Sequence, residues 1–102
     1  MAYSRQDCII LMEMLMKKKM DIEFNFKNQK IINSEALFRI VMNNLESDDL
    51  VRKHFRVSNR YRHAFYDLTY SGEFLAIWIT RCFNTPTKYK NIDDRELNYV
   101  IG

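Results

Sequence analysis

Basic side chains are concentrated in residues 50–66, a stretch of sequence that contains no acidic residue. The nearest acids lie just outside it, at Asp48, Asp49 and Asp67. The basic residues of the stretch are Arg52, Lys53, Arg56, Arg60 and Arg62, together with His54 and His63. Lys and Arg at this density are typical of a surface that binds the phosphate backbone or the narrow minor groove of nucleic acid. A solvated basic surface without a partner is the competing interpretation of the charge alone.

Motifs for catalysis are absent from the sequence. It contains no GxxxxGK[ST], GxGxxG, CxxC or HExxH pattern. Cys8 and Cys82 lie in apolar stretches and are expected to be buried thiols. Two histidines without a carboxylate or cysteine beside them make a weak metal site. We therefore expect a protein that is not an enzyme and that has no metal ion and no cofactor. A small-molecule effector is left open, because no convergent polar group marks a pocket.

The composition indicates one folded domain. The chain has 102 residues, a net charge of +3, 47% hydrophobic residues and 28% charged residues. Its two glycines and one proline disfavour a sandwich or barrel of many short strands. No signal peptide is evident, no apolar stretch reaches the roughly 20 residues of a membrane span, and two cysteines are too few for a disulfide scaffold. We expect a cytoplasmic α+β domain, mostly helical, that does not bind a membrane.

Two apolar helices are expected on either side of the basic stretch. Residues 4–19 begin with Ser4 as a plausible N-cap and Asp7 three residues later, and they end in three lysines. Residues 71–83 form the second helix, with Gly72 in its first turn. Both are apolar around most of their circumference, which one small domain cannot bury completely. We therefore expect a homodimer. The residues assigned to its interface are Ile9, Met12, Leu15, Met16, Ile77, Trp78 and Phe83.

A further helix is predicted over residues 33–46, with Asn33 or Ser34 as its N-cap. Phe38, Val41 and Leu45 recur at helical spacing and should face the core. The opposite face is expected to present Ser34, Glu35, Arg39, Met42 and Asn43. The segment before this helix, residues 20–32, alternates apolar and polar residues like a strand, and a short helix is the alternative.

The basic stretch itself is predicted to be a β-hairpin, with strands at 50–57 and 61–69 and a turn at residues 58–60, where Asn59 tolerates the left-handed conformation. The chain then divides into residues 1–84, which include the dimerisation helices, and residues 85–102. The latter are expected to form a loop at Pro86 and a short helix or tail at 92–100.

Three motifs in residues 45–75 resemble winged-helix DNA-binding regulators of the MarR and PadR kind. They are Leu45-Glu46, Leu50-Val51-Arg52 and Tyr66-x-Leu68-Thr69-x-x-Gly72-x-x-Leu75. In those families the first motif ends the recognition helix, the second enters the first strand of the wing, and the third is the return strand. Asp49 stands where the families usually have a glycine in the left-handed conformation. Thr69 can cap the next helix, and Gly72 lets that helix approach the sheet closely.

The resemblance implies a winged helix-turn-helix that binds double-stranded DNA sequence-specifically, as a small dimeric transcriptional regulator. Helix 33–46 would enter the major groove, where Arg reads guanine and Asn reads adenine, and hairpin 52–69 would be the wing. The residues assigned to DNA binding are Ser34, Glu35, Arg39, Asn43, Arg52, Arg56, Asn59, Arg60 and Arg62. The alternative is a protein-binding winged-helix or α+β module, an adaptor or inhibitor without DNA readout.

Overall fold

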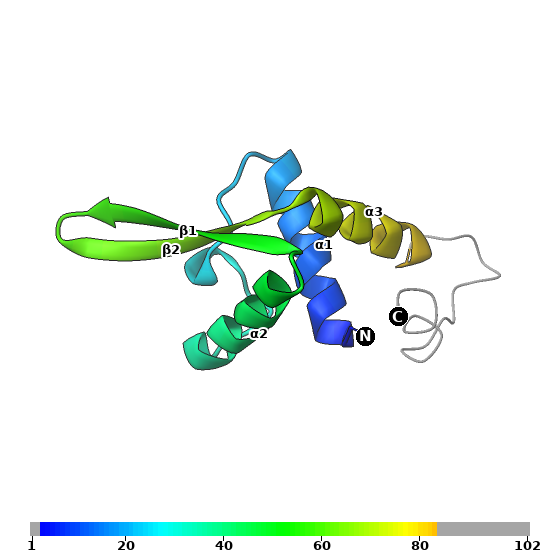
Figure 1. Cartoon of the computed structure of the whole chain (residues 1–102), viewed down its shortest axis with the longest axis horizontal. Coiled ribbons are helices and arrows are strands. Elements are labelled where there is room, and N and C mark those ends of the chain that lie inside the picture. Colours follow the sequence, from blue (N-terminus) through cyan, green and yellow to red (C-terminus); the bar gives the residue numbers. More distant parts are fainter. Residues whose placement is uncertain (1–2, 84–102) are drawn as a thin grey trace.

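The computed structural model describes residues 3–83, and residues 1–2 and 84–102 lie outside this description. The loop expected at Pro86 and the helix expected at 92–100 fall among the latter. The described elements are α1 (Arg5–Lys19), the 3₁₀ turn η1 (Phe26–Asn28), α2 (Glu35–Ser47), β1 (Val51–Ser58), β2 (Tyr61–Leu68) and α3 (Tyr70–Phe83). The predicted α+β, mostly helical class is confirmed for these residues. In Figure 1 the hairpin of β1 and β2 projects away from the three α-helices.

Helix α1 begins at the capping box that its sequence predicted. The Ser4 hydroxyl accepts a hydrogen bond from the backbone N–H of Asp7, and the Asp7 carboxylate accepts one from the N–H of Ser4, both at 3.1 Å. Lys17, Lys18 and Lys19 occupy the last turn, at the negative end of the helix dipole. The buried side chains of α1 are Cys8, Ile10, Leu11, Met14 and Leu15.

Residues 20–32, for which the sequence left a strand and a short helix as alternatives, form one strand bridge and one short 3₁₀ turn. Phe24 pairs with Tyr66 of β2 in a single antiparallel bridge, and the backbone N–H of Tyr66 donates to the Phe24 carbonyl at 2.9 Å. The chain then forms η1, in which Asn25 and Asn28 cap each other's backbone. The buried Gln29 amide bonds to the backbone of the loop at Phe26, Ile31 and Ile32. These polar side chains replace the regular backbone pairing that a longer strand or helix would supply.

Helix α2 uses Ser34 as its N-cap and ends in a left-handed residue. The Ser34 hydroxyl accepts from the N–H of Leu37 at 3.2 Å. At the other end Asp49 has φ 59°, and the N–H of Leu50 donates to the Leu45 carbonyl at 3.0 Å, which is the Schellman pattern. Asp49 therefore adopts the conformation that was expected at this position.

The inward face of α2 differs from the prediction at Met42. Phe38, Val41 and Leu45 are buried as expected, but Met42 is also buried, with 0% of its surface exposed. Its assignment to the polar face was wrong. Both Val41 and Met42 face the core, so the buried side of α2 is wider than the 3-4 spacing of Phe38, Val41 and Leu45 suggests. Ile40 and Leu37 are exposed instead.

Strands β1 and β2 form an antiparallel hairpin in which Val51 pairs with Leu68 and Ser58 with Tyr61. Its tip consists of Asn59 and Arg60, with φ of 49° and 72°. Two consecutive left-handed residues are the mark of a type I′ turn, the connection that matches the twist of a two-stranded ribbon. The predicted strands and the turn between them are confirmed.

Helix α3 is joined to the hairpin by Thr69. The Thr69 hydroxyl accepts from the N–H of Gly72 at 3.0 Å and donates to the Asp49 carbonyl at 2.6 Å. The N–H of Thr69 donates to the carbonyl of Leu50 at 3.0 Å. Thr69 thus caps α3, as predicted from the sequence, and also links the start of α3 to the end of α2.

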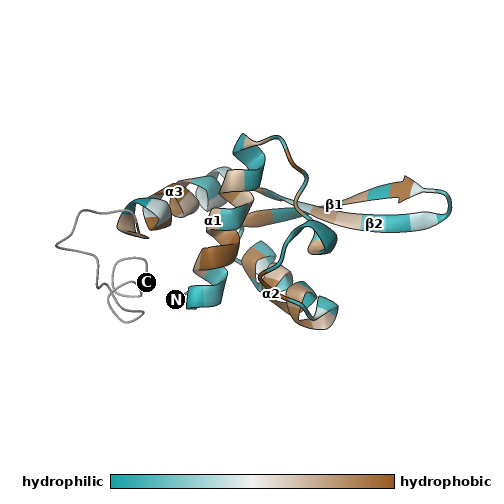
Figure 2. Cartoon of the chain, turned by 180° about the vertical axis from the view of Figure 1, so that it is seen from behind, coloured by the Kyte–Doolittle hydropathy of each residue, from teal (hydrophilic) through white to brown (hydrophobic). Residues whose placement is uncertain are grey.

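The core lies where α1 meets α2, α3 and the base of the hairpin. Buried side chains from all of these elements form one apolar cluster, which includes Leu11 of α1, Phe38 of α2, Val51 of β1, Tyr66 of β2 and Ile79 of α3. Figure 2 shows hydrophobic residues on α1 where it lies between α2 and α3. Among the helices of residues 3–83, none combines the length and the apolar character that crossing a membrane requires.

Candidate nucleic-acid interface

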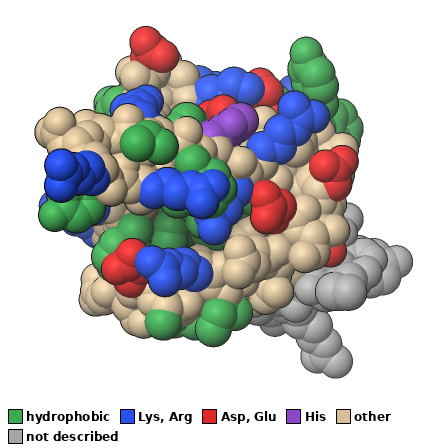
Figure 3. All heavy atoms as spheres, turned by 60° about the vertical axis from the view of Figure 1, so that its left-hand side comes forward, with side chains coloured by type: hydrophobic (Ala, Val, Ile, Leu, Met, Phe, Trp, Pro, Cys, Tyr) green, Lys and Arg blue, Asp and Glu red, His purple; other side chains and the backbone are tan. Residues whose placement is uncertain are grey.

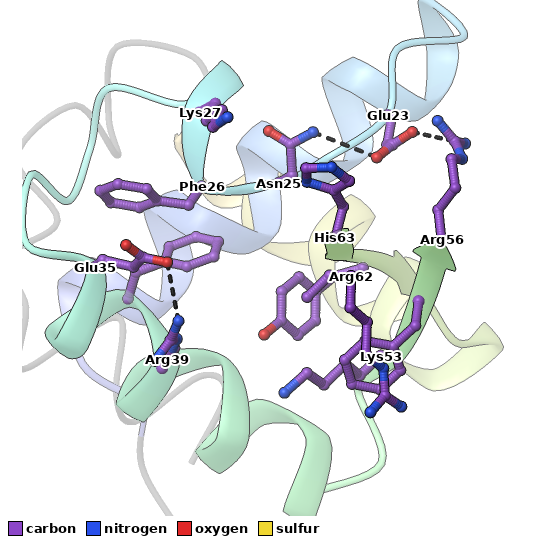
Figure 4. Close-up of a pocket in the computed structure, with 14 residues that line it drawn as sticks. Glu23, Asn25, Phe26, Lys27, Glu35, Arg39, Lys53, Arg56, Arg62 and His63 are labelled. Atoms are coloured by element: carbon purple, nitrogen blue, oxygen red, sulfur yellow. Dashed lines mark hydrogen bonds and ion pairs between the residues drawn. The ribbon is translucent and has the colours of Figure 1, made fainter. Parts of the chain in front are cut away.

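A cleft of about 480 Å³ separates the start of α2 from the hairpin. Three segments line it: residues 23–27, the first turns of α2, and side chains from both faces of the hairpin. Figure 4 shows side chains from these segments pointing toward a common space. The charged and histidine side chains of its lining are Glu23, Lys27, Glu35, Arg39, Lys53, Arg56, Arg62 and His63. A cleft lined mostly by cations attracts an anionic ligand.

The floor of the cleft is aromatic. Phe38 and Tyr66 are buried, and their ring centroids lie 5.8 Å apart in an edge-to-face arrangement. Phe26 of η1 covers Phe38 from the other side, with 5.5 Å between the centroids. Burial, with the nearby Glu46 carboxylate, raises the pKa of Tyr66 above its usual value of 10.0. The phenol is therefore protonated at neutral pH and leaves the floor uncharged.

Two arginines of the cleft are paired with acids. Arg39 contacts Glu35 at 3.0 Å one helical turn away, and Arg56 contacts Glu23 at 2.8 Å across the cleft. Figure 4 draws both pairs as dashed lines. Both arginine side chains are largely exposed, so each ion pair is screened by solvent and contributes little to stability. A phosphate can replace either carboxylate at small cost.

Two other cations are held over an aromatic ring. The Arg62 guanidinium lies 3.7 Å from the ring centroid of Phe55, and the Lys53 ammonium lies 5.1 Å from it. Lys53 and Phe55 are two residues apart on β1, so they share one face of the hairpin with Arg62, the cross-strand partner of Val57. Within residues 3–83 neither Lys53 nor Arg62 forms an ion pair. Their charge is therefore available to a ligand.

The opposite face of the hairpin carries a second aromatic and basic group. The His54 ring stacks on Phe65 at 5.1 Å, and the Arg56 guanidinium lies 5.2 Å from the same ring. Nε2 of His54 lies 3.1 Å from the Asp67 carboxylate without making a hydrogen bond. His54 and His63 do not face each other across the hairpin, because the register places His54 opposite Phe65 and His63 opposite Arg56.

The structure divides the predicted DNA-binding residues into three groups. Glu35, Arg39, Arg56 and Arg62 line the cleft. Ser34 is the N-cap of α2, and Asn43 is exposed farther along this helix. Arg52 lies at the base of the hairpin opposite Asp67, whereas Asn59 and Arg60 form its tip.

The cleft also uses residues that sequence analysis did not assign. They are Glu23, Asn25, Phe26, Lys27, Lys53, Phe55, His63, Ala64 and Tyr66, with Phe38 in the floor. Lys53 and Phe55 could have been found by pairing the strands around a two-residue turn at Asn59 and Arg60, which places both on the face of Arg62. No local signal places Glu23 or Phe26 beside the hairpin. Figure 3 shows Lys and Arg side chains spread over this end of the molecule, with hydrophobic side chains between them.

The residues assigned to a dimer interface are not equally accessible. Leu15 is 5% exposed and belongs to the core of the single chain, so it offers little surface to a partner. Ile9, Met12 and Ile77 are half-buried, while Met16, Trp78 and Phe83 are exposed. An apolar groove of about 390 Å³ runs between α1 and Thr80 of α3. Tyr70 and Phe74, with 92% and 74% of their surface exposed, extend the apolar face of α3 and were not predicted.

Within the part of the chain that the structure describes, no group of three or more His, Cys, Asp or Glu residues could hold a metal ion. The chain matches no known protein-family model, no curated protein and no solved structure.

Proposed function

We infer that the protein binds double-stranded DNA through α2 and the hairpin. One observation carries the proposal: the exposed side of α2 and the basic face of the hairpin border a single cationic cleft. A duplex that contacts both elements would place α2 in the major groove and the backbone of one strand across the cleft. The hairpin would then act as the wing of a winged helix, next to the adjacent minor groove.

The roles of individual residues follow from their positions. Arg39 and Asn43 lie one helical turn apart on α2, at the spacing that places two side chains over neighbouring base edges. Glu35 repels phosphate unless it accepts a hydrogen bond from cytosine. Lys53, Arg56 and Arg62 of the hairpin would bind phosphates, and Arg60 at the tip would reach the minor groove.

The proposal includes a homodimer and a role in transcription regulation. The exposed apolar side chains Met16, Trp78 and Phe83, which lie on α1 and α3 away from the cleft, support a dimer. Tyr70 and Phe74 extend the same face of α3 by the spacing of four residues. Two-fold symmetry would present two copies of α2 to two DNA half-sites. Sedimentation that gives a monomer at high protein concentration would contradict the dimer.

A double variant, Arg56→Ala with Arg62→Ala, tests the DNA-binding proposal. We expect it to weaken binding to a mixed population of genomic duplexes and to reduce the salt dependence by about one phosphate contact per lost arginine. The matched control is Lys19→Ala with Arg81→Ala, which removes the same charge from exposed positions at the ends of α1 and α3. Equal losses in the two double variants would show that only net charge matters and would contradict the site.

A protein-binding module is the second candidate function. It is favoured by the exposed Leu37 and Ile40 on α2, because apolar side chains at these positions are unusual for a helix that contacts only DNA. If this function is correct, the wild-type protein will not bind duplex DNA at low salt. Duplex binding that requires Arg56 and Arg62 supports the first candidate instead.

A further inference from the structure

Phe55 is an aromatic side chain that the core leaves largely uncovered. It lies on the hairpin face that contributes Val51, Tyr66 and Leu68 to the core, but it lies farther toward the tip, beyond the cover of the helices. As a result 47% of its surface is exposed, whereas Tyr66 on the same face is buried. An aromatic ring that borders a cationic cleft offers a flat surface for stacking.

The cations around Phe55 are placed for a nucleotide. The guanidinium of Arg62 lies over the Phe55 ring, 3.7 Å from its centroid, so that the planar guanidinium group and the aromatic ring form one stacked pair. The Lys53 ammonium, 5.1 Å from the same centroid, adds a second charge on this face. Both charges lack a carboxylate partner among residues 3–83, unlike Arg39 and Arg56. A base can stack on this pair while its phosphate contacts the ammonium group.

The cleft has the volume and polarity for such a ligand. Its volume of about 480 Å³ lies within the range of small-ligand pockets, roughly 300–1,000 Å³. Its floor, Phe38 and Tyr66, is apolar and uncharged at neutral pH, and its rim is basic. A ligand with one flat aromatic group and one phosphate fits this distribution better than a phosphate alone, which would leave the rings exposed to water.

A base inside a regular duplex is not available to this site. Both of its faces are covered by neighbouring bases, and only its edges are accessible in the grooves. A base that is unpaired, or that has left the stack, exposes a face, and its removal from the duplex costs least where pairing is already lost.

We propose that the cleft accepts one unpaired nucleotide of a DNA duplex, with its base stacked on the Phe55–Arg62 pair and its phosphate on Lys53. The inference rests on the proposed DNA binding. It specifies the preferred DNA as a duplex that places a bulged or unstacked base at the cleft. Phe55 is then the residue that distinguishes this DNA from a regular duplex, while Arg56 and Arg62 contribute to the binding of both kinds of DNA.

Fluorescence anisotropy with three labelled duplexes of about 20 base pairs tests the proposal. The first is fully paired, the second contains one central unpaired nucleotide, and the third contains an abasic residue at the same place. We expect the unpaired nucleotide to increase affinity about tenfold, the scale of one base–aromatic stack, and the abasic residue to abolish this gain. Phe55→Leu should lose the preference, and Phe55→Tyr, which retains the ring, should keep it.

The outcomes distinguish the two proposals. Equal affinity of the wild-type protein for the paired and bulged duplexes, or an equal gain from the abasic residue, overturns the nucleotide site and leaves the DNA-binding proposal in place. A Phe55→Leu variant that keeps the full preference also overturns it. No binding to any of the three duplexes at low salt overturns both. The abasic comparison needs no variant, so the test does not depend on the folding of Phe55→Leu.

Discussion

A Cβ atom on residue 72 would lie 1.8 Å from the carbonyl oxygen of Leu50, so α3 and the turn before β1 meet at Gly72 without room for a side chain. The same Leu50 carbonyl accepts the hydrogen bond from Thr69 that seats the start of α3. The contact is with backbone, which cannot rotate away as a side chain could. Gly72 therefore fixes the position of α3 relative to the hairpin.

We predict that Gly72→Ala destabilises the protein by about 3 kcal/mol, the upper part of the usual range for overpacking. The reason is that either α3 or the Leu50 turn must move to admit the methyl group. Urea unfolding followed by circular dichroism measures the loss, with the exposed neighbour Ser71→Ala as the matched control. A Gly72→Ala variant as stable as the control would show that the joint is loose.

Arg60 combines an unfavourable backbone with a proposed DNA contact. Its φ of 72° lies in the region that glycine adopts without steric cost, at the tip position where hairpins usually have glycine. We predict that Arg60→Gly raises the free energy of unfolding by about 1 kcal/mol and also weakens DNA binding. Arg60→Ala is the control, because it removes the same guanidinium group and keeps the strained backbone.

Thermal unfolding and DNA titration of the two Arg60 variants separate the effects. Both variants should bind DNA equally weakly, and only the glycine variant should unfold at a higher temperature than the wild-type protein. If Arg60→Gly proves no more stable than Arg60→Ala, the tip conformation carries no strain. If both bind DNA like the wild-type protein, Arg60 makes no contact with it.

Glu23 is an internal competitor of the DNA phosphate. Its carboxylate contacts Arg56 at 2.8 Å, so a phosphate that approaches Arg56 must displace it. We predict that Glu23→Gln increases DNA affinity several-fold, because the amide has the shape of the carboxylate without its charge. Glu13→Gln is the matched control: Glu13 pairs with Lys17 at 3.1 Å on α1, outside the residues that line the cleft.

Binding isotherms of the two glutamine variants at one salt concentration give the comparison. Glu23→Gln should bind more tightly than Glu13→Gln, although the net charge of the two proteins is the same. Identical affinities would mean that the Glu23–Arg56 pair does not lie on the DNA-binding surface.

Local chemistry made part of the fold predictable. The Ser4–Asp7 capping box, the left-handed Asp49 and the Asn59–Arg60 turn each depend on a few neighbouring residues, and the structure has all of them. The joint at Thr69 and Gly72 was also predictable, because a hydroxyl and a glycine three residues apart suit a helix that begins against a sheet.

The cleft was not predictable in the same way. The segment around Glu23 and Phe26 alternates apolar and polar residues like a strand, but asparagine and glutamine side chains satisfy its backbone instead of a ladder or a helix. Its position beside the hairpin depends on contacts between residues that are distant in sequence, namely the Phe24–Tyr66 bridge and the Glu23–Arg56 ion pair. Met42 was misplaced for a related reason: whether it is buried depends on how α2 packs against its neighbours, not on α2 alone.

The affinity of the wild-type protein for duplex DNA, measured across a series of salt concentrations, tests the central proposal most directly. If Lys53, Arg56 and Arg62 each contact one phosphate, the logarithm of the association constant should fall against the logarithm of salt concentration with a slope of about −2.7 for each protomer. Binding at low salt with a slope of this size supports the cleft as a DNA-binding surface. No binding at low salt, or a slope near zero, would contradict it.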